Sequence, residues 1–218
     1  RWVPDSTWMN VSHIVGLLAA HNVTQLTFVG ESRERTVAHN LAMLLLHHSR
    51  TSRAHEEAVR RNFAKTHDTV SFLFPFPWLT HLLAPPSQAA VHNRTLEIHF
   101  IHHKWLSQHD AVTAARDHPD FCRPPPGALR QVILALGSHA VNYQPVSFST
   151  KTVTHSLRRL HRACASDRVH LIATESPAVH PMCFSHDKMD GPAMNNGFMQ
   201  RVNAATRRAS QELRIPFF

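Results

Sequence analysis

The sequence predicts an α/β fold, in which a mostly parallel sheet carries helices on both faces. Short apolar runs such as 131–136 and 169–174 alternate with stretches whose apolar residues recur at helical spacing. The chain of 218 residues is 43% hydrophobic, which is enough for one sizeable core. We therefore expect a single domain over residues 1–218. The sequence starts at Arg1, and residues 215–218 predict the beginning of a strand, so we expect a fragment truncated at both ends.

The first half of the chain supports this alternation. An extended opening is expected because proline at position 4 disfavours helix at the residue before it. Two amphipathic helices flank a short buried strand, and a polar stretch follows as helix or loop. A later aromatic segment holds two prolines, which predicts an edge strand or an ordered loop. In order, the expected elements are helix 11–18, strand 26–29, helix 37–45, helix or loop 50–68, and edge strand or loop 70–78.

The second half continues the pattern. Its proline-containing segment 117–127 is expected to be a loop inside the domain, because core signals resume directly after it. Alternating or continuous apolar runs predict the strands, and apolar residues three or four apart predict the helices. In order, these are strand 96–100, a brief helix 111–116, strand 131–136, helix 153–164, strand 169–174, helix 194–213 and a strand beginning at 215.

Ser32 lies at the junction between the first strand and its helix. The apolar run Leu26–Val29 stops at Gly30, and helical spacing follows in Val37, Leu41, Leu44 and Leu45. One interpretation is that Ser32 caps the helix, which is the commonest role for serine there. The other is that its hydroxyl is an acyl-transfer nucleophile beside helix N–H groups that could stabilise an oxyanion.

The composition limits the classes of partner and cofactor. A net charge of +8 and a pI near 10.4 favour general attraction to polyanions, but the basic residues are scattered and no sequence-specific nucleic-acid motif is present. The 20 histidines form no His-Glu-x-x-His pattern and the 3 cysteines no Cys-x-x-Cys pair, so no metal or other cofactor is predicted.

The cysteines and three glycosylation sequons bear on the compartment. Asn10-Val-Ser, Asn22-Val-Thr and Asn93-Arg-Thr would be acceptors in a secretory compartment. The three cysteines allow one internal disulfide, with the pairing open. Cys122 with Cys183 is a candidate pair, because both are expected in loops near strand ends. We expect localisation in the secretory pathway, in the Golgi lumen or outside the cell, with any membrane anchor lying outside this fragment.

The chain resembles the PC-esterase branch of the SGNH (GDSL-like) hydrolase superfamily. That branch includes plant trichome-birefringence-like polysaccharide O-acetyltransferases and animal sialic-acid O-acetyltransferase-like proteins. Its opening motifs are similar to Arg1-Trp-Val-Pro and to Phe28-Val-Gly-Glu-Ser-Arg-x-Arg35 here, and two later strand ends are similar to Leu136-Gly-Ser-His139 and Thr174-Glu-Ser-Pro-Ala-Val-His180. The resemblance implies a three-layer α/β/α sandwich of the SGNH hydrolase type.

The resemblance also implies a function and its residues. Ser32 would be the nucleophile of an acyl-ester hydrolase or O-acetyltransferase acting on glycan O-acyl groups. The oxyanion candidates are Ser32, Gly137 and Asn142. Four further residues are candidate neighbours of the site: Glu31, Arg33, His139 and His180.

Two departures from the family pattern define the alternative. The family motif Gly-Asp-Ser is Gly-Glu-Ser here, with Glu31 in place of the aspartate. The carboxyl-terminal Asp-x-x-His, which supplies the family's base, is not found before Phe218. His139, His180 and His186 could in principle activate Ser32, although structural or surface roles are commoner for histidine. The alternative is therefore a catalytically inactive relative that serves as a structural or carbohydrate-binding subunit of a larger assembly.

Overall fold

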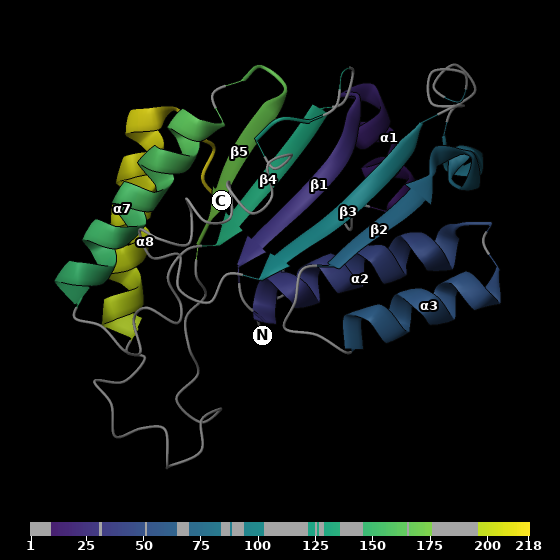
Figure 1. The fold of residues 1–218 in the computed structure, drawn as a ribbon, viewed down its shortest axis with the longest axis horizontal. Helices are drawn as coiled ribbons and strands as arrows, with labels where there is room; N and C mark the ends of the chain where they lie inside the picture. Colours follow the sequence, from purple (N-terminus) through teal and green to yellow (C-terminus); the bar gives the residue numbers. More distant parts are fainter. Residues whose placement is uncertain are drawn as a thin grey trace, which may run out of the picture.

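The computed structural model describes residues 10–30, 32–50, 52–64, 70–83, 88, 94–102, 122–124, 126, 129–135, 146–164, 166–175 and 196–218. Strands and helices alternate in this part of the chain (Figure 1). The strands are β1 (Val23–Gly30), β2 (Val70–Pro75), β3 (Thr95–His102), β4 (Leu129–Ala135) and β5 (Val169–Thr174). The helices are α1 (Val11–Ala20), α2 (Ser32–His48), α3 (Arg53–Ala64), α7 (Val146–Ala163) and α8 (Asn196–Leu213), with 3-10 turns η1 (Phe76–Trp78) and η2 (Thr80–Leu82).

The five strands form one mixed sheet in the order β2-β3-β1-β4-β5. β1 pairs in parallel with both β3 and β4, and β4 pairs in parallel with β5. β2 is antiparallel to β3 and lies at the edge, where proline at position 75 removes no ladder bond from a central strand. The α/β class with a mostly parallel sheet is therefore as the sequence predicts.

The end of the chain extends the sheet beside β5. Phe217 forms a parallel bridge with Ala173, and the Ala173 N–H donates to the Pro216 carbonyl at 2.9 Å. The Phe218 N–H donates in turn to the Ala173 carbonyl at 3.0 Å. Where the sequence predicts a strand from Ile215 onward, the structure thus has one isolated bridge at Phe217.

Buried apolar side chains form two clusters, and β1 contributes to both. Leu26 and Phe28 belong to a cluster that includes residues of α1, α2, α3, β2 and β3. Val29 belongs to the other, which includes residues of α7, α8, β4 and β5. Because neighbouring side chains of a strand point to opposite faces, β1 has buried contacts on both sides. Figure 1 shows α7 beside α8 near β5, and α2 beside α3 nearer β2 and β3.

Most predicted elements are present, and the differences lie in their bounds and faces. The strand predicted at 169–174 coincides with β5, while α7 begins at Val146, seven residues before the helix predicted from the apolar spacing. The predicted buried face of the first long helix is wrong in part, because Val37 is 46% and Leu44 37% exposed. The small residues Ala38 and Ala42 are fully buried instead. The predicted opening segment 1–5 and brief helix 111–116 lie outside the described residues.

No helix in the described ranges combines the length and the apolar composition needed to cross a membrane.

A row of polar side chains crosses three neighbouring strands. The Gln25 amide Nε2 donates to Glu97 at 2.7 Å, and Arg130 Nε donates to Gln25 Oε1 at 2.9 Å. Gln25 is in register with Glu97 on one side and with Arg130 on the other. Arg130 is only 4% exposed, so its guanidinium needs hydrogen-bond partners inside the protein, and Gln25 is one of them. The amide of Gln25 thus connects the two charged groups, because it donates to the Glu97 carboxylate and accepts from the Arg130 guanidinium.

We predict that Gln25→Met destabilises the fold by about 2 kcal/mol, because it removes the two hydrogen bonds that Gln25 forms with Glu97 and Arg130. Gln131→Met is the matched control, since Gln131 is half-buried on the neighbouring strand and has no recorded side-chain bond among the described residues. That change is expected to cost less than about 1 kcal/mol. Urea unfolding of both variants measures the difference, and equal losses would contradict the bridging role of Gln25.

A disulfide joins Cys122 to Cys164, with a Cα–Cα distance of 4.5 Å. Cys164 follows α7 directly and is buried, so the bond fixes residue 122 against the end of that helix. The candidate pair Cys122–Cys183 is therefore wrong. The error arises because pairing depends on spatial approach, which cysteine spacing alone does not reveal.

We predict that Cys122→Ser lowers the free energy of unfolding by about 4 kcal/mol, the chain-entropy value for a bond that spans 42 residues. Cys183→Ser is the control and should leave the crosslink intact. Denaturant titration with and without reductant measures the stability, and non-reducing peptide mapping identifies the pair. Recovery of a peptide linking Cys122 to Cys183 would contradict the structure.

Candidate functional site

The carboxyl ends of β1, β4 and β5 meet at one edge of the sheet. Val29 is in register with Leu134, and Leu134 with Ala173, so these three parallel strands finish side by side. The chain passes from β1 to β3 on one side, and then to β4 on the other side of β1. In α/β proteins, ligands usually bind outside the strand ends at such a reversal of strand order.

Ser32 is the first residue of α2, two positions after the end of β1. α2 is 17 residues long, so its first turn presents unpaired N–H groups and the positive end of a helix dipole. The backbone therefore places Ser32 beside the reversal point, at an edge that favours negative charge. Placement of Ser32 at this edge agrees with the strand–turn–helix junction predicted from the sequence.

Several predicted site residues cannot be placed. The side chains of Ser32 and Arg33 fall outside what the structure describes, and six whole residues do so as well: Glu31, Gly137, His139, Asn142, His180 and His186. The topology nevertheless limits where two of their segments start. Residues 136 onward leave β4, and residues 176 onward leave β5, at the same edge as Ser32.

Gly30 and Glu34 are in close contact next to Ser32. An added Cβ at Gly30 would lie 2.6 Å from Glu34 Oε2 and 2.7 Å from its Cγ. Glu34 is 5% exposed and lies in the first turn of α2, where the helix dipole favours a negative charge. Glycine is thus favoured at position 30, because a larger residue would force the buried Glu34 side chain to move.

Sequence reasoning missed Glu34. Its available signal was its place, an acidic residue within the first turn of a helix after a strand–glycine turn. That signal indicates a favourable helix start but gives no sign that the side chain folds back under Gly30. The structure adds Glu34 as a residue that shapes the turn carrying Ser32.

Sequence reasoning also missed one occurrence of the Asp-x-x-His spacing, at Asp167–His170. Here Asp167 lies in the turn before β5 and His170 is an exposed residue near the start of that strand. His170 is in register with Gln131, which pairs with Leu26, four residues before Gly30. The imidazole is therefore roughly 13 Å or more from the Ser32 edge, out of hydrogen-bond reach.

Within the described residues, no group of three or more His, Cys, Asp and Glu side chains is placed to hold a metal ion. Scans of family models, curated proteins and solved structures found no match for this chain. The functional argument therefore depends on the chain's own geometry.

We predict that Gly30→Ala destabilises the protein by about 1–3 kcal/mol, because the new methyl group displaces the buried Glu34 side chain. In a Glu34→Ala background the same change should cost less, and a double-mutant cycle measures this coupling. Gly16→Ala is the matched control. Its Cβ would have nothing within 4 Å, and alanine in α1 should be neutral or stabilising by up to about 1 kcal/mol.

Additive effects of Gly30→Ala and Glu34→Ala would contradict the contact, because unconnected residues contribute independently to the free energy of unfolding.

Proposed function

We propose that the protein is a serine esterase or O-acetyltransferase that acts on O-acyl groups of glycans, within the PC-esterase branch of the SGNH hydrolases. One observation carries this proposal: Ser32 starts α2 directly after the central strand, at the point where the strand order reverses. In an α/β sheet this position combines an exposed junction with helix N–H donors.

The reaction would proceed through an acyl-enzyme. The Ser32 hydroxyl oxygen attacks the acyl carbonyl carbon while its proton passes to a base, and the negative carbonyl oxygen is stabilised by N–H groups. Backbone groups of Ser32 and Gly137, with Asn142, are the donors suggested by the family resemblance. The sugar oxygen leaves with a proton, and water or a second sugar hydroxyl then takes the acyl group from Ser32.

The distribution of buried clusters supports a three-layer α/β/α sandwich. Leu26 and Phe28 of β1 share a cluster with α1, α2 and α3, whereas Val29 shares one with α7 and α8. Since these β1 side chains alternate between faces, helices would cover both sides of the sheet. This is the layer order expected for an SGNH hydrolase.

Two features support a secretory location. The Cys122–Cys164 disulfide would persist in an oxidising compartment and not in the cytosol. Two sequon asparagines, Asn10 and Asn22, are exposed, as glycosylation requires, while Asn93 lies outside the described residues. Acylated glycans of the Golgi lumen or the cell exterior are the matching substrates, and protein assembly partners would be met there as well.

The second candidate is an inactive relative that binds carbohydrate or supports an assembly. It is favoured by the position of Asp167–His170, which lies toward the opposite edge of the sheet from Ser32. Within the part of the chain that the structure describes, Asp-x-x-His occurs at Asp167–His170 alone. Because that pair is far from Ser32, a base for Ser32 must come from another segment. A serine without a base is a weak nucleophile at neutral pH.

We predict that a fluorophosphonate probe forms one covalent adduct with the folded protein, and that Ser32→Ala abolishes it, because the probe reacts with activated serines. Ser49→Ala is the matched control. Ser49 follows the other end of α2, and its hydroxyl donates to the Leu46 carbonyl at 2.9 Å. Intact mass spectrometry measures the adduct, and thermal melting confirms that each variant is folded. A folded protein that stays unlabelled would favour the inactive relative.

A further inference from the structure

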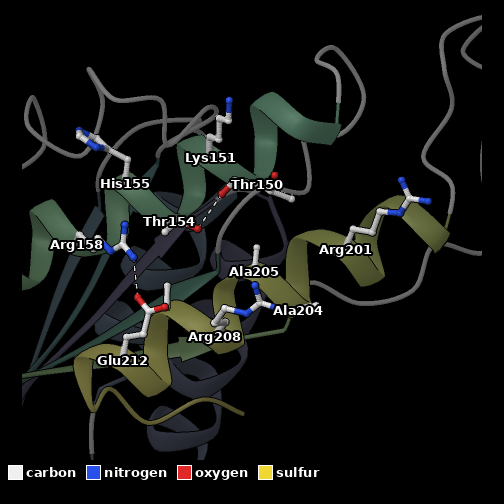
Figure 2. Close-up of a pocket in the computed structure, with 11 residues that line it drawn as sticks. Thr150, Lys151, Thr154, His155, Arg158, Arg201, Ala204, Ala205, Arg208 and Glu212 are labelled. Atoms are coloured by element: carbon white, nitrogen blue, oxygen red, sulfur yellow. Dashed lines mark hydrogen bonds and ion pairs between the residues drawn. The ribbon is translucent and has the colours of Figure 1, made fainter.

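An open groove of about 690 Å³ lies between α7 and α8. Figure 2 shows its wall residues, with Arg158 reaching across from α7 to Glu212 and Arg208 on the facing side of α8. Lys151 and Arg201 also line it, toward the first turns of the two helices. The lining belongs to these two helices alone, so the groove is distinct from the turn that carries Ser32.

The groove is strongly basic. α7 and α8 together contain seven Lys and Arg residues but a single acidic residue, Glu212. Glu212 forms an ion pair with Arg158 at 2.6 Å. Lys151, Arg201 and Arg208 have no ion-pair partner within the described part of the chain. Close positive charges along one concave surface attract a chain of negative charges.

The Arg158–Glu212 pair shows that a guanidinium in the groove wall can form a hydrogen bond with a carboxylate. A carboxylate oxygen already approaches a guanidinium nitrogen of its wall at 2.6 Å, within the range of a charge-assisted hydrogen bond. Both side chains are about half exposed, so an external carboxylate can reach the same guanidinium. The arginine fork matches the planar geometry of carboxylates.

The remaining lining favours a sugar backbone over other polyanions. Its apolar members are the small residues Ala204, Ala205 and Ala209, which offer no large anchor for a peptide helix. It contains no Phe, Tyr or Trp, and His155 is its one aromatic ring, so it offers no row of large rings for successive nucleic-acid bases. Thr150 and Thr154 donate their hydroxyl protons to backbone carbonyls, at 3.1 and 2.9 Å, and their oxygens remain able to accept from sugar hydroxyls.

We infer that the α7–α8 groove binds a linear carboxylated glycan, a polyuronate, through Lys151, Arg158, Arg201 and Arg208. The glycan's carboxylates contact these cations, and its hydroxyls lie over the threonine and alanine side chains. This surface goes beyond the proposed acyl transfer and does not depend on it, because none of its contacts involves Ser32.

The test measures binding of an oligogalacturonate to the full chain by calorimetry at about 0.1 M salt, where exposed charges still interact across a groove. Arg201→Gln with Arg208→Gln should weaken binding roughly tenfold, through loss of two charge-assisted contacts. The matched control is Arg159→Gln with Arg162→Gln, which removes the same charge from exposed positions of α7 outside the groove. That control should change the affinity by less than about threefold.

Glu212→Gln is expected to increase the affinity for oligogalacturonate, a result that a damaged fold would not give. It frees Arg158 and removes the one negative charge of the groove, so oligogalacturonate should bind more tightly. Neutral dextran, poly-glutamate and an oligothymidylate are the other probes. Equal losses in the two double variants, weaker binding by Glu212→Gln, or tighter binding of any of these three probes would each overturn the inference. A Ser32→Ala variant should bind as the unaltered chain does.

Discussion

The position of β1 in the middle of the sheet is the constraint on which the rest of the structure depends. β1 pairs with a parallel strand on each side, and its side chains join both buried clusters. The path of β1 is therefore fixed by packing and pairing on every side. At its end, Gly30 allows α2 to turn closely over the strand, with the buried Glu34 in the space this leaves. A rigid strand and a close turn together give Ser32 a defined backbone position, which a nucleophile needs.

The two halves of β1 differ in a way that suits this task. At its beginning, Gln25 joins Glu97 and Arg130 in a hydrogen-bonded row across three strands. A polar row of this kind has partners only in one register, so it opposes slippage of the parallel strands. At its end, Val29 is paired with the apolar residues Ile101 and Leu134. The polar network thus sets the register at the start of β1, while the end of β1 next to the candidate site is paired through apolar residues.

The sequence predicts the sheet well because apolar runs report directly on burial. β5 matches its prediction residue for residue, since Val169, Leu171 and Ala173 are all buried on one face. The face of α2 is predicted less well because helix packing depends on size as well as polarity. Ala38 and Ala42 are small enough to lie against the sheet, so the larger Val37 is left exposed. The disulfide fails for a related reason, as it depends on where the end of α7 lies in space.

Some features of the candidate site can be predicted from the sequence, and others depend on packing that the sequence does not reveal. The strand–turn–helix junction at Ser32 and the common edge of three strand ends follow from periodicity and topology, which the sequence carries. The Gly30–Glu34 contact does not, because it depends on how closely one turn of helix approaches one strand. Likewise Asp167 and His170 have the spacing of a catalytic motif, but they lie at the beginning of β5, and Ser32 follows the end of β1. A motif specifies chemistry only when the fold places it on the same side as its partners.

The charges of α7 and α8 raise a question that packing alone does not answer. The two helices run in parallel. Residues from earlier turns of both, such as Thr150 and Arg201, line one groove, and Arg158 pairs with Glu212 nearer their ends. Parallel helix dipoles repel each other, so they oppose close approach of α7 and α8. Glu212 lies in the last turn of α8, where the dipole disfavours an acid, and its ion pair with Arg158 offsets that cost. Arg201 and Arg208 of the same helix line the groove and have no ion-pair partner in the described chain. Their positive charges lie along one groove, and a bound anion would offset the repulsion between them, which is the physical reason to look for one there.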